Sequence, residues 1–307
     1  MVNLTFSGRF VPGCLAALVL ALASPVILSG QFLREEATHY TSRPDGFDPV
    51  KLTVDQGEAG VLKFIATNET YYPFTVKITF LKMDNFTAVY RTREAFVKFG
   101  KNFLFDLRIK DPESGYELDY NFSYVAGKPE AANETDFVYL VPLKPGSIPV
   151  AGKVGESGIM DSFSVMKGDT VYCSRKGIVA AIPGDTRRSF RLSQKNALEI
   201  LHDDGTVMIY NGLAGGALNL VPGMTVYPGD PVAAVTENTI FTLQLVALVP
   251  GQELPSLPIL YAVDETTGAQ FSRIEGRIMV VHPESLIIKE MTPREIKQRG
   301  KSQGKNR

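Results

Sequence analysis

The chain has few of the residues that most metal and redox sites need. Its 307 residues include two cysteines, three histidines and no tryptophan. The cysteines, Cys14 and Cys173, are far apart and no Cys-x-x-Cys spacing occurs, which excludes a thiolate zinc site. Because Cys14 lies in a segment that we expect to be removed, the exported chain keeps one thiol and forms no internal disulfide.

The chain also has no excess of charge of either sign. Lys and Arg number 32 and Asp and Glu 33, so the formal net charge is -1. This balance gives no general electrostatic reason to bind nucleic acid or an anionic membrane surface, and we expect no nucleic-acid partner. Hydrophobic residues make up 44% and charged residues 21%, which is typical of globular domains, and the length allows two of them.

Only one long apolar run occurs, from Val11 to Leu28, with Arg9 as the one positive charge before it. This pattern predicts a signal peptide over residues 1–30, with a small-x-small cleavage pattern at 21–23 and a second option near Gly30. An uncleaved membrane anchor is the alternative, and only then would the chain touch a membrane. Either way, the rest of the chain is expected outside the cytoplasm.

The chain is rich in turn residues, with 27 Gly and 19 Pro, and helical periodicity is scarce. Both features predict a mostly β protein. Short strands with polar turns indicate an Ig-like antiparallel β-sandwich over residues 31–145. The aromatic run 71–74 is predicted to pack in its core. The expected strands are 61–67, 74–80, 88–91, 103–109, 120–126 and 136–142.

A second β-rich domain is expected over residues 146–290. Its turns repeat: Gly168-Asp169 precedes one short strand and Gly229-Asp230 another. Asp203-Asp204-Gly205 has the composition of a hairpin turn. Further strands are expected at 257–262 and 277–281. Residues 291–307 hold six Lys or Arg and no aromatic residue, which predicts a basic, disordered tail. Thr292-Pro293-Arg294-Glu295 has the pattern of a cap for a short helix at its start.

The order of turns and strands in this second domain carries a family resemblance. Gly168-Asp169-x-Val171 is followed by the strand and turn 198–206, by Tyr210-Asn211-Gly212-Leu213, and then by Pro228-Gly229-Asp230 and the strand 241–245. Over about residues 157–249 the sequence resembles the lysostaphin/LytM-type peptidoglycan metalloendopeptidases. The resemblance implies a β-rich duplicated hybrid motif fold, and a preceding β-sandwich is also similar to bacterial envelope proteins of this family.

The resemblance also implies where a zinc ion would be held. Family members carry His-x-x-x-Asp, His-x-His and a third histidine in Tyr-x-His-Leu. In this sequence those positions fall on Gly158 and Ser162, on Thr242 and Gln244, and on Gly212. Glycine has no side-chain donor, and Ser, Thr and Gln are poor zinc ligands. We therefore expect a degenerate groove at these positions, with zinc and peptidase activity lost and no cofactor.

Four neighbouring residues complete the predicted site as possible remnants: Asp161, His202, Tyr210 and Asn211. Asp161 is adjacent to Ser162, but neighbouring residues of a strand point to opposite faces. His202 is the only histidine inside the matched region. An active zinc peptidase that cleaves peptidoglycan cross-links, with Asp161 and His202 as displaced ligands, is the alternative.

The sequence therefore predicts an exported, non-catalytic protein of the periplasm or cell envelope of a bacterium. The resemblance implies that such a pseudo-peptidase binds peptidoglycan or regulates a cell-wall hydrolase. A structural subunit of an envelope assembly is a further alternative, in which both domains act as scaffolds.

Overall fold

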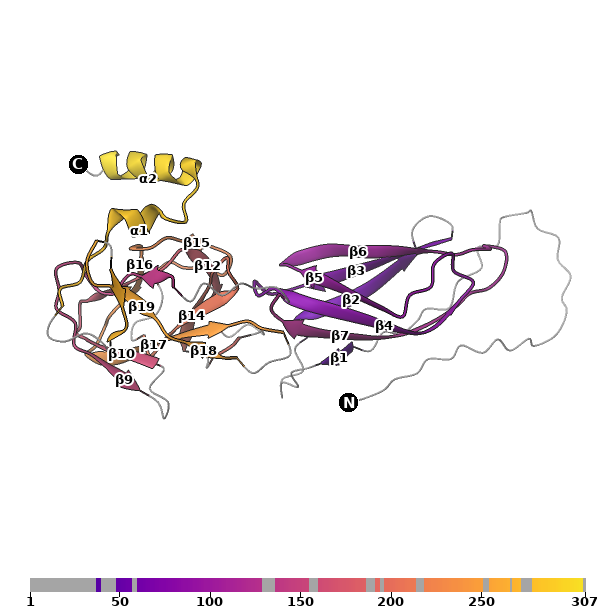
Figure 1. The fold of residues 1–307 in the computed structure, drawn as a ribbon, viewed down its shortest axis with the longest axis horizontal. Helices are drawn as coiled ribbons and strands as arrows, with labels where there is room; N and C mark the ends of the chain where they lie inside the picture. Colours follow the sequence, from indigo (N-terminus) through magenta and orange to yellow (C-terminus); the bar gives the residue numbers. More distant parts are fainter. Residues whose placement is uncertain are drawn as a thin grey trace, which may run out of the picture.

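The chain folds mostly into β-strands, as the sequence predicts (Figure 1). The computed structural model describes residues 37–39, 48–56, 60–128, 136–154, 160–185, 191–193, 196–213, 218–250, 254–265, 267–271 and 278–305. The predicted signal peptide, residues 1–30, lies outside this part of the chain. Among the described residues, no helix is both long and apolar enough to cross a membrane.

The N-terminal half forms two sheets that pack face to face. One sheet has the order β1 (Ala37–His39), β7 (Glu117–Ala126), β4 (Phe74–Asp84) and β5 (Thr92–Val97). The other has the order β2 (Val50–Gln56), β3 (Val61–Asn68) and β6 (Gly100–Arg108). Phe64 of β3 stacks on Phe105 of β6 and meets the edge of Phe80 on β4, which joins the two sheets through aromatic contacts.

The second half is built on one large sheet. Its order is β15 (Thr225–Val226), β12 (Gly177–Ala181), β13 (Ala197–Leu201), β14 (Thr206–Asn211), β17 (Thr239–Ala247), β10 (Met160–Val165) and β9 (Ala151–Val154), and β18 (Ser256–Leu257) also pairs with β17. The predicted turn at Asp203-Asp204-Gly205 is confirmed, because it joins β13 to β14. One face of the sheet covers a buried cluster around Phe163, Phe241 and Tyr210.

Two small sheets complete this half, and one of them corrects a prediction. β11 (Thr170–Tyr172) pairs with β16 (Pro231–Ala234), and the other sheet has the order β20 (Gly268–Ala269), β19 (Leu260–Ala262) and β8 (Val138–Tyr139). The strand expected at 136–142 in the sandwich is therefore shorter and lies elsewhere. Its residues Tyr139 and Val141 bury their side chains in the cluster of the second half, which draws the segment away from the sandwich.

Two other predicted strands are absent from the described residues. The segment 88–91 is a loop that precedes β5, where the backbone amide of Tyr90 donates to Met83 Sδ. Residues 278–281 form no strand either. Val280 makes backbone hydrogen bonds only with Gly146 and Ser147 and is otherwise held by its buried side chain. An apolar run predicts burial well, but strand pairing also needs a free neighbouring edge.

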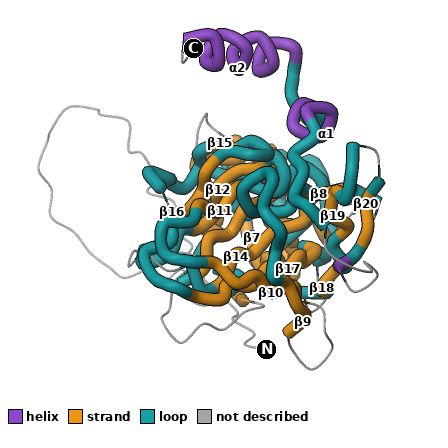
Figure 2. Tube along the Cα trace, turned by 90° about the vertical axis from the view of Figure 1, so that its left-hand side faces the viewer, coloured by secondary structure: helices purple, strands orange, loops and turns teal. Residues whose placement is uncertain are grey.

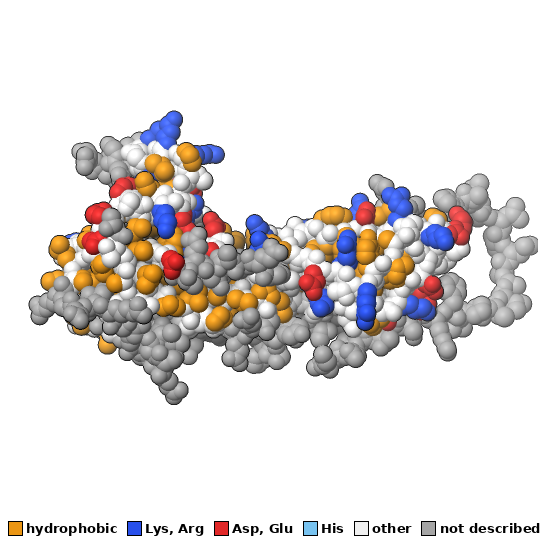
Figure 3. Space-filling model, viewed as in Figure 1, with side chains coloured by type: hydrophobic (Ala, Val, Ile, Leu, Met, Phe, Trp, Pro, Cys, Tyr) orange, Lys and Arg blue, Asp and Glu red, His pale blue; other side chains and the backbone are white. Residues whose placement is uncertain are grey.

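Two helices follow the sheets and correct the prediction of a disordered tail. α1 spans Glu284–Ile288 and α2 spans Pro293–Lys305. Proline at the first helical position and the Thr292–Glu295 pair, in which the Thr292 amide donates to the Glu295 carboxylate at 2.6 Å, form an N-terminal cap. α2 stands clear of the strands, and basic side chains lie on the side of it that faces away from them (Figures 2 and 3).

The two halves share one buried apolar cluster. Val207, Ile209 and Val246 of the large sheet belong to the same cluster as the core of the sandwich. At one edge of this contact Gly127 has φ +104°, and a Cβ there would lie 2.2 Å from the carbonyl oxygen of Leu248. Only glycine lets the two backbones approach this closely.

Candidate functional site

The predicted groove residues lie on one face of the large sheet. Ser162 of β10 is opposite Thr242 of β17, and Thr242 is opposite Asn211 of β14. Residues directly opposite each other in antiparallel strands share a face, so these three side chains form one row. Gln244 lies two residues farther along β17 on the same face. Segments that are far apart in sequence thus bring four predicted residues together.

The other predicted residues are placed differently. Gly212 follows β14 directly and has φ +76°, and a Cβ there would lie 3.2 Å from the carbonyl oxygen of Ile240. Gly158 lies outside the described residues. Tyr210 points to the opposite face, where it is fully buried and its hydroxyl accepts a hydrogen bond from the Ser174 amide at 2.9 Å. Tyr210 is therefore a core residue and not part of the groove.

The displaced ligand pair, Asp161 and His202, does not meet. Asp161 is buried on the face opposite to Ser162, beside Tyr261, and burial followed by the charge of Asp161 raises the pKa of the Tyr261 hydroxyl. His202 follows β13, which is three strands away from β10. At about 4.8 Å per strand this is roughly 14 Å, far beyond the reach of one ion with bonds of about 2 Å.

The donor set of the groove does not fit zinc. The row Ser162–Thr242–Asn211 offers hydroxyl and amide groups, which are poor zinc donors. Within the described part of the chain, no three His, Cys, Asp or Glu side chains cluster as a metal site would require. The one buried thiol, Cys173, lies on the other side of the sheet, and burial raises the pKa of this thiol far above its usual value. The side chains of this face can donate and accept hydrogen bonds.

A side chain of the sandwich reaches this same face. The hydroxyl of Tyr72 donates to the carboxylate of Glu199, and both residues are fully buried. Glu199 of β13 is opposite Ile209, and Ile209 is opposite Gln244. These three residues form a second row beside the row of Ser162, Thr242 and Asn211. The Glu199 carboxylate also accepts from the backbone amides of Leu192 and Ser193 at 3.1 and 3.0 Å and from the Ser193 hydroxyl. These donors supply the hydrogen bonds that a buried carboxylate needs in place of water.

The hairpin turn after His202 belongs to a buried ionic network. Arg175, with a side chain only 2% exposed, pairs with Asp204 and Glu290, each at 2.7 Å. Burial alone would lower the pKa of Arg175, but the hydrogen bond to Glu290 and the nearby Tyr139 and Asp204 raise it. Burial likewise favours a higher pKa for Asp204, yet its bond from the Thr206 amide and the charge of Arg175 lower it. Arg175 and Asp204 therefore both stay ionised.

His202 is neutral in this setting. Burial and the charge of Arg175 lower the pKa of its imidazole to about 4. The Nδ1 atom lies 2.8 Å from the carbonyl oxygen of Lys176, so Nδ1 carries the proton and donates it. The Nε2 atom is buried and has no hydrogen-bond partner among the described residues. The imidazole thus ties the start of the turn to the backbone of Lys176.

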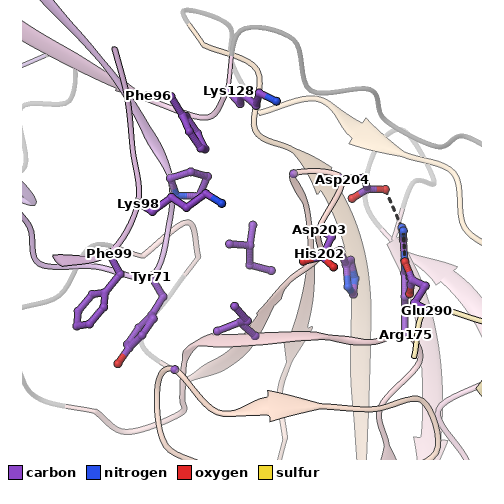
Figure 4. A pocket seen from close by; sticks show the side chains of 15 residues that line it. Tyr71, Phe96, Lys98, Phe99, Lys128, Arg175, His202, Asp203, Asp204 and Glu290 are labelled. Carbon is purple, nitrogen blue, oxygen red and sulfur yellow. Dashed lines mark hydrogen bonds and ion pairs between the residues drawn. The ribbon is translucent and has the colours of Figure 1, made fainter. Parts of the chain in front are cut away.

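A cleft of about 740 Å³ opens between the sandwich and this turn (Figure 4). The sandwich side contributes Tyr71, Phe96, Lys98, Phe99 and Lys128, among others, and the opposite side includes Ile178, Leu201, Asp203 and the Arg175 network. The sequence prediction missed these residues and assigned 71–74 to the core as a whole. Tyr72 and Phe74 are buried as predicted, whereas Tyr71 lines the cleft. The local signal was the mixture of aromatic and basic residues at 96–99.

No protein-family model and no curated protein sequence matches this chain. Among solved structures, the chain is similar to the M23 metalloprotease pseudoalterin from the deep sea, with 14% identity and a TM-score of 0.28 over 48% of this chain and 98% of the other. It is also similar to Csd3 from Helicobacter pylori in two crystal forms, with 11% and 12% identity and a TM-score of 0.29. These two matches cover 84% and 83% of this chain and 84% and 79% of Csd3.

Proposed function

We propose that this chain is a non-catalytic protein of the bacterial cell envelope that binds peptidoglycan or regulates a cell-wall hydrolase. In this proposal residues 31–145 form the sandwich domain. Residues 146–290 form a lysostaphin/LytM-type domain whose zinc site has been replaced by hydrogen-bonding side chains. The N-terminal segment directs export to the periplasm or envelope.

The row Ser162–Thr242–Asn211 carries this proposal. These positions come from three separate strands, and the family resemblance places metal-binding or catalytic residues at two of them, Ser162 and Thr242. Their meeting on one face supports the alignment of the sequence with the family. Hydroxyl and amide groups suit a glycan or a peptide stem, which are rich in hydrogen-bonding groups, and do not suit a zinc ion.

The zinc content of the purified chain and its action on peptidoglycan test the loss of catalysis. The chain is purified without a histidine tag, its zinc content is measured by mass spectrometry, and it is incubated with purified peptidoglycan. We expect less than stoichiometric zinc, no released fragments, and either cosedimentation with the peptidoglycan or stimulation of a wall hydrolase. One zinc per chain together with cleavage would overturn the proposal and favour the peptidase. If the chain shows neither peptidoglycan binding nor hydrolase stimulation, the structural subunit is favoured.

Alanine substitutions test the groove itself. The variant Thr242→Ala/Gln244→Ala removes two side chains of this face and is expected to weaken cosedimentation about tenfold or more. The control Thr92→Ala changes an exposed threonine on the edge strand of the sandwich. Unchanged binding by the double variant would show that this face is not the contact surface.

A further inference from the structure

The cleft between the two halves has walls of opposite charge. On the sandwich side, the ammonium groups of Lys98 and Lys128 each lie 6.0 Å from the centroid of the Phe96 ring. Within the described part of the chain, neither ammonium pairs with a carboxylate. Both lysines line the cleft, so this wall carries two positive charges that would attract an anion.

The opposite wall is acidic at its surface. Asp203 is exposed at the tip of the turn after β13 and forms no ion pair with another described residue. Its neighbour Asp204 already forms an ion pair with Arg175. Figure 4 shows Asp203 across the gap from Lys98 and Phe96. The free charges of the cleft are therefore basic on one side and acidic on the other.

The space between the walls is apolar. Pro73, Phe96, Ile178 and Leu201 line it, and the ring of Tyr71 stacks on Phe99 with centroids 4.4 Å apart. Phe99 is 55% exposed, which leaves much of its ring open to the solvent. The volume of about 740 Å³ lies within the range of roughly 300–1,000 Å³ that small-molecule sites span.

We propose that this cleft binds a short peptide that carries both a free carboxylate and a free ammonium group. The carboxylate lies between Lys98 and Lys128, the ammonium pairs with Asp203, and an aliphatic side chain packs on Phe96 and Leu201. A ligand with only one charged group would leave the charge of one wall unpaired, and an uncharged ligand would leave the charges of both walls unpaired. The lining of the cleft does not include Ser162, Thr242 or Gln244, and this proposal does not depend on their role.

Four versions of one tripeptide test the charges of the ligand. Ala-Leu-Ala is titrated into the full chain, labelled with nitrogen-15, beside its amidated, its N-acetylated and its doubly blocked forms. Binding is followed by amide chemical shifts. We expect blocking either end to raise the Kd about tenfold, as for loss of one charge-assisted hydrogen bond. Equal Kd values for the four peptides, or no shifts with Ala-Leu-Ala, would overturn the proposal.

Matched variants assign each end of the peptide to a wall. In Lys98→Gln/Lys128→Gln, amidation of the peptide is expected to lose its effect on the Kd, and in Asp203→Asn acetylation is expected to lose its effect. Lys101→Gln and Asp106→Asn change exposed charges on β6 outside the cleft and serve as controls. If the cleft variants behave like these controls, the assignment is wrong. Thr242→Ala/Gln244→Ala is expected to bind the tripeptide normally, so this proposal and the groove proposal can fail separately.

Discussion

At the scale of single residues, substitution of Arg175 is expected to have the largest effect on stability. Its buried guanidinium joins the turn at Asp204 to Glu290 near the C-terminus. Arg175→Met removes the charge and leaves two carboxylates without their guanidinium partner, which we expect to cost about 3–5 kcal/mol in the free energy of unfolding. Urea denaturation measures this change.

An exposed ion pair provides the control for Arg175. Lys51 pairs with Glu69 at 2.6 Å, but the two side chains are 57% and 39% exposed. Lys51→Met is therefore expected to change the free energy of unfolding by less than about 1 kcal/mol. Similar losses in the two variants would contradict the central role of the buried network.

The buried imidazole of His202 makes stability depend on pH. Its pKa is about 4 in the folded chain, against 6.5 when unperturbed. Below pH 6.5 the unfolded chain binds a proton that the folded chain does not, so stability is complete above pH 6.5 and decreases as the pH falls towards 4. The full loss is about 3 kcal/mol. Burial also lowers the pKa of His282, which acts in the same direction.

A glutamine at position 202 separates this contribution from the others. His202→Gln keeps a donor for the Lys176 carbonyl oxygen but does not titrate. The free energy of unfolding of this variant is expected to vary less between pH 6.5 and 4.5 than that of the unchanged chain, when both are measured by urea denaturation. The lowered pKa values of Asp204 and Glu295 affect only more acidic solutions, because these carboxyls ionise near 3.8 and 4.5 when unperturbed. Identical pH profiles would refute a buried, neutral His202.

At the scale of elements, the two C-terminal helices are attached very differently. α1 buries Ile287, the loop after it buries Met291 against Leu140, and Glu290 pairs with Arg175. α2 is held mainly through Glu295, which accepts from Tyr227 at 2.7 Å and from Lys176 at 3.1 Å. The hydrogen bond from the Thr292 amide, followed by the one from the Tyr227 hydroxyl, lowers the pKa of Glu295 to about 2.

Two truncations measure this difference. A chain that ends at Thr292 loses α2 and is expected to lose about 1 kcal/mol in the free energy of unfolding. A chain that ends at Pro283 also loses the Ile287 side chain and the Glu290 partner, with an expected loss of about 4 kcal/mol or more. Equal losses in urea denaturation would mean that α2 supports the fold as much as α1 does.

Strands with regular alternation could be predicted from the sequence, whereas the partners of short segments could not. β3 and β4 follow the predicted 61–67 and 74–80 because alternate side chains enter one core. The segment 136–142 was also apolar, but its pairing with β19 depends on residues more than a hundred positions later. A resemblance of the sequence to a family groups Ser162, Thr242 and Asn211, and the strand register places them in one row. The cleft could not be predicted, because the aromatic and basic residues at 96–99 indicate a binding surface but not the segment of the second half that faces it.

At the scale of the whole molecule, the halves are held by packed backbone and not by a flexible linker alone. Gly127→Ala places a Cβ 2.2 Å from the Leu248 carbonyl oxygen, so one half must shift. We expect a larger radius of gyration in small-angle scattering and a loss of stability of about 2 kcal/mol or more. A shared apolar interface of this kind normally fixes the relative position of two domains.

Gly100→Ala is the matched control for this change. Gly100 has φ +92°, close to the value at Gly127, but no atom lies within 4 Å of a Cβ built there. Both variants therefore carry the same kind of backbone strain, and only one of them forces the halves apart. If the radius of gyration changes equally in both, or in neither, the contact at Leu248 does not set the arrangement.

The ionic network around Arg175 also affects the order in which contacts form during synthesis of the chain. A ribosome makes the chain from its N-terminus, and Glu290 emerges 115 residues after Arg175. Until then the guanidinium can find Asp204 but lacks its second counter-ion. The second half therefore reaches its final form only after Glu290 has emerged, and a nascent chain that is shorter than this still lacks the ion pair between Glu290 and Arg175.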